Sequence, residues 1–266
     1  MDEGATRLLM ASVDGALAAC GMSTRSSVEG AAFVGIWVRP EQRRRGAGTA
    51  LLAALTAHAR ELGLVSQRAR VRGRQEAGLA FLAHHGFEDS STDVEARLDL
   101  SAGGPPPAAP PEGVEIVSLA SRPDLGPEVY QLALEGFREL PVVGPSVVVP
   151  YDTWQAEHIG QALPGGSFLA VAGGRLIGWA GLEARPGDAT GAEHGLTVVA
   201  REWRRRGVGG ALKRAQIDWA RRSGYRMLVT YTDDGNEPIL RLNEGLGYRP
   251  WIIETTCFRP LDGHGS

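Results

Sequence analysis

The stretch Arg204-Arg205-Arg206-Gly207-Val208-Gly209 follows an apolar run that ends at Val199 and precedes a segment with helical periodicity. An earlier stretch, Arg43-Arg44-Arg45-Gly46-Ala47-Gly48, has nearly the same residues in the same setting. The offset between the two stretches is 161 positions, from Arg43 to Arg204, and the same offset joins Gly63 to Gly224. Because register is kept from the turn onward through the rest of both copies, the chain contains an internal repeat.

The sequence of each copy predicts the same order of secondary-structure elements: strand, glycine-rich turn, helix, strand, short helix, strand. The first helix of each copy stops at Gly63 or Gly224, the residue type favoured just after a helix C-terminus. A segment rich in proline and glycine, 103–111, separates the copies and resembles a semi-stiff linker. We therefore expect an N-terminal domain at 1–100, a linker at 101–111 and a C-terminal domain at 112–266.

The second copy has additional predicted elements before the repeated unit. They are a strand near 114–119, helices near 124–139 and 153–162, and a hairpin at 168–182. The first copy retains only a hairpin, at 8–20, so it is expected to be truncated.

Composition excludes several classes of function. The chain has 266 residues, a net charge of −3 and a pI of about 6.1, so it has no bulk positive field for nucleic acid or an acidic membrane. Two cysteines are too few for a disulfide framework and have no metal-ligand spacing. No apolar run is long enough to span a membrane, and the acidic start is unlike a signal peptide. We expect a cytoplasmic protein without a metal, as a monomer or weak homodimer.

The turn between strand and helix has a use in binding phosphate. Backbone N–H groups at a helix N-terminus can cradle a pyrophosphate, glycine allows close approach, and arginine adds charge. A tight turn with solvated arginines is the alternative. The spacing matches neither the ATP-binding phosphate loop nor the dinucleotide fingerprint, because no Lys-Ser/Thr pair and no third glycine follow at the required positions.

The chain resembles the GNAT superfamily of acyl-CoA-dependent N-acyltransferases. The resemblance rests on Arg204 to Gly209, on the helix that ends at Gly224, and on the segment from Asn236 to Gly247-Tyr248. It implies an α/β fold with two tandem GNAT domains, each a mixed, mostly antiparallel sheet that is splayed between its fourth and fifth strands and flanked by helices.

The resemblance also implies where acetyl-CoA binds. The pantetheine arm would pair with Leu196, Thr197, Val198 and Val199, and Asn236 would contact it. The pyrophosphate would lie on Arg204, Arg205, Arg206, Gly207, Val208, Gly209, Gly210 and Ala211. The first copy would either still bind CoA or only bury surface against the second, and its corresponding residues are Arg43, Arg44, Arg45, Gly46, Gly48 and Thr49.

Acetyl transfer to an amine needs a base and is helped by an acid. The family's strand-four glutamate lies eleven residues before the motif, which gives Glu193 in the second copy and Ala32 in the first. His194 is a second candidate base, and a solvated loop carboxylate or a strand-end histidine is the alternative for each. Asn243 stands where the family usually has its acidic tyrosine, so Asn243 would bond the sulfur without protonating it, or Tyr231 or Tyr248 would help.

These observations predict an N-acetyltransferase that moves acetyl from acetyl-CoA to a primary amine of a small molecule, with its active site in the C-terminal domain and a degenerate N-terminal domain. A non-catalytic acyl-CoA sensor or scaffold is the alternative. A third possibility is a nucleic-acid adaptor that uses the arginine runs. The arginines of 68–74 alternate along a predicted strand, so their side chains share one face. This pattern indicates either a site for an anionic ligand or a face that is exposed to water because the covering helices are missing.

Overall fold

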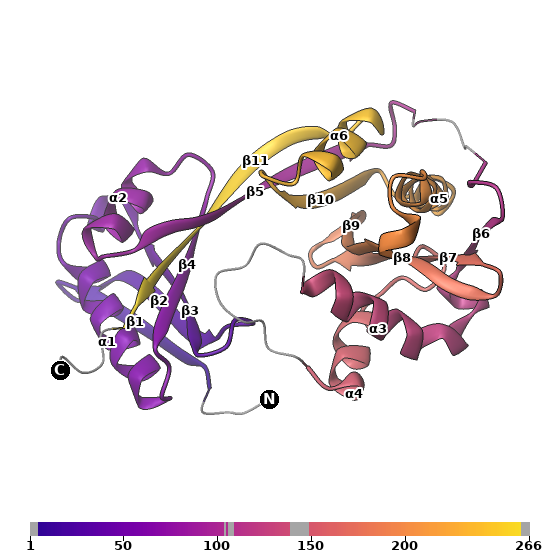
Figure 1. The fold of residues 1–266 in the computed structure, drawn as a ribbon. Coiled ribbons are helices and arrows are strands. Elements are labelled where there is room, and N and C mark those ends of the chain that lie inside the picture. Colours follow the sequence, from indigo (N-terminus) through magenta and orange to yellow (C-terminus); the bar gives the residue numbers. More distant parts are fainter. Residues whose placement is uncertain (1–4, 104, 106–108, 139–148, 262–266) are drawn as a thin grey trace. The chain divides into compact units, whose positions relative to one another are not determined.

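The computed structural model describes residues 5–103, 105, 109–138 and 149–261 (Figure 1). They form two compact units. The first contains 5–93 and 253–261, and the second contains 94–103, 105, 109–138 and 149–252. Within these ranges no helix is both long enough and apolar enough to cross a membrane.

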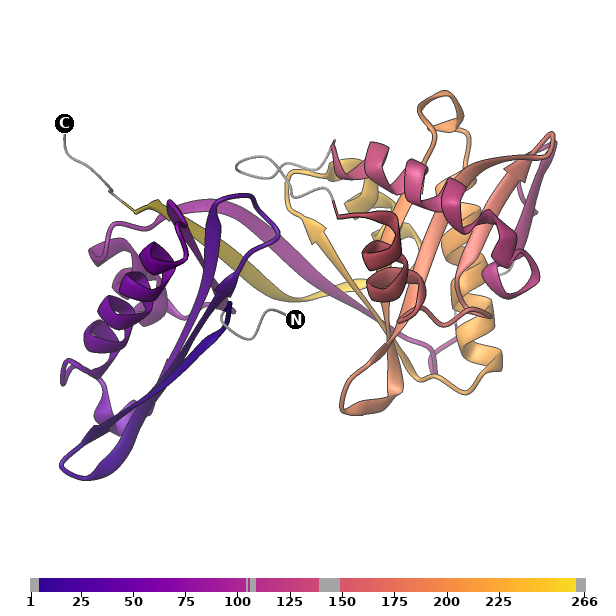
Figure 2. The same ribbon diagram turned by 90° about the horizontal axis from the view of Figure 1, so that it is seen from below.

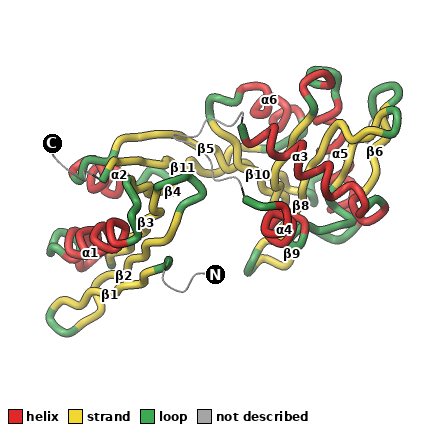
Figure 3. The backbone as a smooth tube through the Cα atoms, turned by 60° about the horizontal axis from the view of Figure 1, so that its bottom comes forward, coloured by secondary structure: helices red, strands yellow, loops and turns green. Residues whose placement is uncertain are grey.

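The first unit is a sheet with helices on one face (Figures 1 and 3). Its elements are β1 Arg7–Val13, β2 Ala16–Arg25, β3 Ala31–Val38, α1 Ala47–Glu61, β4 Ser66–Arg72, α2 Glu76–His84, the start of β5 Glu88–Asp99 and most of β11 Arg249–Pro260. The strand order is β1-β2-β3-β4-β11. β3 and β4 are parallel, and the other three neighbouring pairs are antiparallel. Leu52 and Leu55 of α1 pack on Val34 and Val71 of the sheet, because α1 turns its apolar stripe inward.

The second unit has helices on both faces of its sheet. Its elements are the end of β5, β6 Val114–Ser118, α3 Gly126–Phe137, α4 Tyr151–Trp154, β7 Phe168–Ala172, β8 Arg175–Arg185, β9 Asp188–Val199, α5 Val208–Arg222, β10 Met227–Asp233, α6 Glu237–Gly245 and the start of β11. Short 3₁₀ turns occur in this unit at Leu119–Ser121, Pro123–Leu125 and Arg201–Trp203, and a π-turn at Gln155–Ile159; the first unit has a 3₁₀ turn at Pro40–Gln42. The strand order is β5-β10-β9-β8-β7-β6.

Two separate cores cover the two faces of the second sheet. Leu132 and Trp154 of α3 and α4 pack against Trp179 and Val198 on one face. Leu212 of α5 packs on the other face, where Ala180 is completely buried. Figures 1 and 2 show α5 on the side of β7–β9 opposite α3 and α4.

The last strand of each repeat joins the sheet of the other repeat. β11, which ends the second repeat, pairs antiparallel with β4 from Pro260 opposite Ser66 to Glu254 opposite Arg72. β5, which ends the first repeat, lies beside β10. The expected domains 1–100 and 112–266 therefore follow the repeats along the chain, whereas the compact units exchange the final strands. Strand pairing is non-local, so sequence spacing alone does not reveal which sheet a final strand completes.

The expected α/β fold is confirmed at the level of its elements. The two main helices end at Gly63 and Gly224, which have φ angles of +70° and +85° and close the helices in the left-handed conformation. The predicted splay is also present: β9 pairs in parallel with β10 only from Gly191 to Glu193, and β3 pairs with β4 only from Ala31 to Phe33.

Candidate active site

The arginine and glycine turn of the second repeat presents free backbone donors at the start of α5. Arg205 and Gly207 have φ angles of +58° and +84°, so the chain turns sharply through two left-handed residues. Gly207 is the N-cap of α5 and supplies no side-chain cap to the first helical N–H groups. Arg204 donates from Nε to the carbonyl of Val199 at 2.9 Å and fixes the turn to the end of β9. The geometry suits an anion.

The turn of the first repeat has the same backbone. Arg44 and Gly46 have φ angles of +60° and +86°, and Gly46 caps α1 without a side-chain bond. Arg45, however, is paired with Asp14 at 2.6 Å and with Gln42 at 2.7 Å. Part of the positive charge of this turn is therefore already neutralised.

The strand segment Leu196–Val199 lies beyond the last pair between β9 and β10. Within the described chain, the buried hydroxyl of Thr197 has no hydrogen-bond partner. Asn243 on α6 is 3% exposed, and its amide nitrogen donates to the Thr232 hydroxyl at 3.2 Å. Its Oδ1 lacks a partner among the described residues. An unpaired polar atom inside a protein is costly, so these atoms mark a place that a polar ligand would complete. Asn236 stands at the N-cap position of α6, without a capping bond from its side chain.

A β-bulge interrupts β9 just after His194. Thr197 pairs with Ala180 and His194 pairs with Leu182, so two residues of β9, Gly195 and Leu196, oppose the single residue Gly181 of β8. The equivalent strands β2 and β3 pair without any shift. Bulges of this kind redirect side chains and are frequent beside active sites.

The bulge corrects the expected correspondence between the repeats. Gly191 pairs with Met227 as Ala31 pairs with Ser66, so upstream of the bulge the offset is one residue shorter. The structural equivalent of Glu193 is therefore Phe33 and not Ala32. The extra residue in β9 is invisible to an ungapped count, and the conclusion that the first repeat lacks this carboxylate is unchanged.

Glu193 lies directly opposite Glu183 of β8. Opposed residues of an antiparallel pair project from the same face of the sheet, which places both carboxylates on the side of α3 and α4. Burial raises the pKa of Glu183, and the neighbouring Glu193 raises it further. The first repeat has Thr24 and Phe33 at this pair. Sequence analysis did not identify Glu183, because only the strand register shows that it meets Glu193.

The adjacent candidates Glu193 and His194 project from opposite faces. His194 is 6% exposed and points toward α5, where its Nδ1 lies 3.0 Å from Oε1 of Gln216. Its Nε2 is hydrogen-bonded to the Tyr248 hydroxyl. Burial holds the pKa of His194 well below its usual value, and the nearby Lys213 lowers it further against a smaller opposing effect of Gln216. Both ring nitrogens are engaged inside the protein, so His194 is not placed as a solvent-facing base.

Two more buried groups adjoin His194. Lys213, the chain's single lysine, is 1% exposed, and burial lowers its pKa to about 7. Its Nζ lies 5.5 Å from the centre of the Tyr248 ring. Burial also raises the pKa of Tyr248 far above its ordinary value.

Comparison with known proteins decides the family. The model of the acetyltransferase (GNAT) family matches residues 1–87 and 127–248, that is, the repeated part of both copies. The chain belongs to the GNAT acetyltransferase family. The resemblance expected from the turn and from the closing segment of the second repeat is thereby confirmed.

Several relatives of this GNAT chain match it over most of the length of both chains. A mycothiol acetyltransferase from Thermomonospora curvata is 28% identical over 97% of this chain and 84% of its own. One from Thermobispora bispora is 30% identical over 82% of this chain and 72% of its own.

Solved structures show the tandem fold. An N-acetyltransferase from Sphaerobacter thermophilus has a TM-score of 0.80 at 20% identity and covers 94% of this chain and 79% of its own. A tandem GNAT protein from the clavulanic acid biosynthesis pathway has a TM-score of 0.76 at 23% identity, with 98% and 85% covered. The tandem GNAT fold is therefore established for this chain.

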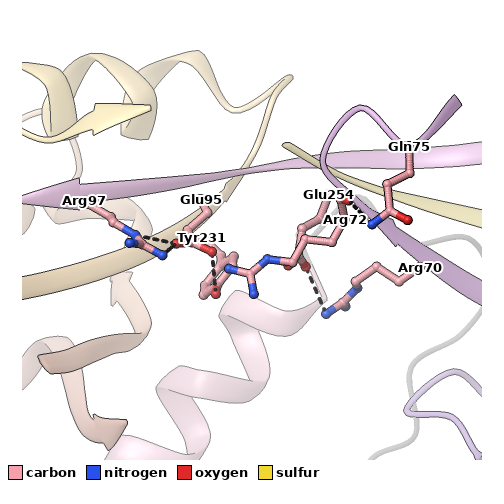
Figure 4. Close-up of polar contacts among 7 residues, drawn as sticks. All are labelled: Arg70, Arg72, Gln75, Glu95, Arg97, Tyr231 and Glu254. Atoms are coloured by element: carbon pink, nitrogen blue, oxygen red, sulfur yellow. Dashed lines mark hydrogen bonds and ion pairs between the residues drawn. The ribbon is translucent and has the colours of Figure 1, made fainter. Parts of the chain in front are cut away.

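Within this GNAT fold, Tyr231 is engaged by a residue of the first repeat. Its hydroxyl donates to Oε2 of Glu95 at 3.0 Å (Figure 4). Glu95 is fully buried on β5, and its Oε1 is 2.7 Å from Arg97. The Tyr231 phenol is thus a partner of a buried ion pair, which the sequence did not predict because β5 belongs to the other repeat.

The arginine face of β4 also has an internal partner. In the first unit, Arg72 and Arg70 lie 3.2 and 3.5 Å from the carboxylate of Glu254, which is 7% exposed on β11 (Figure 4). β4 ends at Arg72, so Arg74 is outside the strand, and the expectation that the arginines of 68–74 all alternate along one strand is wrong. Neither an anionic ligand nor a bare face is needed to explain Arg70 and Arg72, because the exchanged strand supplies a carboxylate.

Proposed function

We propose that this GNAT acetyltransferase moves an acetyl group from acetyl-CoA to a primary amine of a small molecule, and that the second repeat carries the active site. One observation carries the proposal: beside the splay, the second repeat has Glu183 and Glu193 where the first has Thr24 and Phe33. Neither Thr nor Phe can take a proton from an amine near neutral pH.

The residues of the second repeat fit acetyl-CoA. The uncapped start of α5 and the arginines around Gly207 would hold the pyrophosphate. Leu196–Val199 has no partner strand on its β10 side and would pair with an extended amide-bearing arm. Thr197 and Asn243 each have a buried polar atom that such an arm would satisfy. When bound, acetyl-CoA supplies an acetyl thioester whose carbonyl carbon accepts a nucleophile.

Glu193 is proposed as the base. An amine reaches the protein as an ammonium ion, and the Glu193 carboxylate takes its proton, which leaves the nitrogen lone pair free to attack. Glu183 opposes it, and burial together with the neighbouring Glu193 carboxylate raises the pKa of Glu183. Asn243 would donate to the departing sulfur without protonating it, because an amide has no acidic proton at this pH.

The acceptor is proposed to be a small molecule that carries a thiol. The relatives of similar length are named mycothiol acetyltransferase, which makes this class the first to test. Glu183 and Glu193 lie on the face covered by α3 and α4, helices that the first repeat lacks. These helices would line the acceptor's position.

The deciding experiment combines binding with turnover. Acetyl-CoA is titrated calorimetrically into the wild-type protein and into Gly207→Glu and Gly46→Glu, because a carboxylate in the turn repels phosphate at that repeat alone. Formation of the acetylated product is then followed by mass spectrometry for the wild-type protein and for Glu193→Gln, with a panel of small amines that includes thiol-bearing ones. Loss of binding only in Gly207→Glu, and loss of turnover with retained binding in Glu193→Gln, are expected. Binding without turnover for any amine would favour an acyl-CoA sensor instead.

A further inference from the structure

A chain of hydrogen bonds runs through the buried α5 face of the second unit. Gln216 donates from Nε2 to the backbone carbonyls of Ala180 at 3.1 Å and Gly181 at 2.9 Å. Its Oε1 therefore faces His194 and accepts from Nδ1–H at 3.0 Å. With Nδ1 protonated, the neutral ring accepts at Nε2, and the Tyr248 hydroxyl donates to it. The donor and the acceptor of each of these hydrogen bonds are therefore assigned.

This chain of hydrogen bonds ends on β8, the strand that pairs with β9 at the bulge. Ala180 and Gly181 are the β8 residues at which the register with β9 shifts. A bulge takes backbone groups out of the ladder, and buried backbone carbonyls require donors from elsewhere. The Gln216 amide supplies two such hydrogen bonds. His194, the other end of the bulge, is held by the same side chain.

The first repeat shows how the same fold packs without this chain. The positions that correspond to His194, Lys213, Gln216 and Tyr248 are Val34, Leu52, Leu55 and Phe87. All four are buried in one apolar cluster, with exposures of 2%, 2%, 0% and 4%. The register between β2 and β3 is unbroken there. Bulge and polar chain therefore occur together in the second repeat and are absent together from the first.

A gain in stability does not explain why the second repeat has this chain of buried polar side chains. Burial of polar and ionisable groups costs free energy that apolar residues of similar volume avoid, and the first repeat contains such an apolar set. The polar chain does, however, fix β9 at His194, the residue that directly follows its last pair with β10. A slip of one residue here would turn Glu193 to the other face of the sheet.

We propose that Gln216, His194 and Tyr248 are positioning residues that hold the β9 bulge and thereby keep the Glu193 carboxylate opposite Glu183, on the acceptor's face. This inference rests on the proposed function, in which Glu193 is the base. The three residues act through the backbone of β9 and do not touch the acceptor.

The test replaces these residues with those of the first repeat. Gln216→Leu and Tyr248→Phe are made singly and together, and a full graft adds His194→Val and Lys213→Leu. Thr56→Ala is the control, because Thr56 is also buried and donates to a backbone carbonyl, that of Leu52, but lies on α1 of the first unit, whereas β9 belongs to the second. The readouts are kcat, KM for the amine, the Kd of acetyl-CoA by calorimetry, and amide exchange of the peptide covering 191–199.

We expect Gln216→Leu to lower kcat about 10- to 100-fold, as expected when a reacting group is displaced by about 1 Å, with the Kd of acetyl-CoA changed less than about 2-fold. Tyr248→Phe lowers kcat less, and the double variant loses less than the product of the two single losses, because both act through His194. Exchange in 191–199 becomes faster in Gln216→Leu and stays unchanged in Thr56→Ala.

Folded Gln216→Leu or grafted protein with wild-type kcat overturns the inference, as does unchanged exchange in 191–199. Multiplicative losses in the double variant also contradict it, because they indicate independent effects. If the graft does not fold, the single variants still decide. If instead Glu193→Gln keeps full activity, the proposed base is wrong, whereas loss in Glu193→Gln with no loss in Gln216→Leu rejects the positioning role alone.

Discussion

Replacement of the buried Lys213 by leucine is expected to stabilise the protein, and to do so in a pH-dependent way. Lys213 is 1% exposed, and burial alone lowers its pKa from 10.5 to about 7. No carboxylate of the described residues forms an ion pair with it, and its contact is the ring of Tyr248. Leucine is already accommodated at this place in the first repeat, as Leu52.

The sign follows from proton linkage. Between pH 7 and 10.5 the unfolded chain binds a proton at this lysine that the folded chain does not, so the lysine opposes folding in that range. Each tenfold difference in proton affinity is worth about 1.4 kcal/mol. The lysine therefore costs on the order of 4 kcal/mol at pH 7 and below, and the cost vanishes as the pH approaches 10.5.

Urea unfolding at several pH values between 6 and 10 measures this effect. Five of the six tryptophans lie in the second unit, so their fluorescence follows the unit that contains Lys213. We expect Lys213→Leu to raise the free energy of unfolding by about 2–4 kcal/mol near pH 7, less than the full linkage value because the contact with Tyr248 is lost. The gain should shrink steadily toward pH 10.

The reciprocal variant Leu52→Lys is the matched control. It places an amine in the apolar core of the first unit, so it should destabilise that unit near pH 7 and recover part of the loss as the pH rises. A gain in Lys213→Leu that is equal at pH 7 and pH 10, or a loss of stability at every pH, would refute the reasoning.

Three further predictions follow from the site and its surroundings. Glu193→Gln should bring the raised pKa of Glu183 part of the way back toward its ordinary value, because burial remains but the like charge of Glu193 is removed; a carboxyl titration of Glu183 that does not move contradicts the coupling. Glu95→Gln should destabilise the second unit by about 1–3 kcal/mol, since Arg97 and Tyr231 lose a charged acceptor inside the protein; thermal unfolding measures it, and Tyr231→Phe should lose less. Glu254→Gln should destabilise the first unit by a smaller amount, because Arg70 and Arg72 are half-exposed and regain water; an effect larger than that of Glu95→Gln would be inconsistent with this difference in burial.

The sequence by itself determined the local structure and the family. The two arginine and glycine turns predicted a strand that enters a helix through a glycine-rich turn, and Gly207 and Gly46 have φ angles of +84° and +86° there. These features depend on a few neighbouring residues, and glycine tolerates positive φ wherever it stands. Helix ends, the hairpins and the splay follow from similarly local rules and from the family resemblance.

Only the tertiary structure decided which side chains meet. Glu183 became part of the candidate site because the β8–β9 register places it opposite Glu193, and a single extra residue in β9 shifted the correspondence with the first repeat from Ala32 to Phe33. The exchange of β5 and β11 gave Tyr231 and Arg72 their acidic partners. Strand register and strand exchange depend on hydrogen bonds between residues far apart in the chain, whose pairing is chosen by the packing of the whole sheet and not by local sequence.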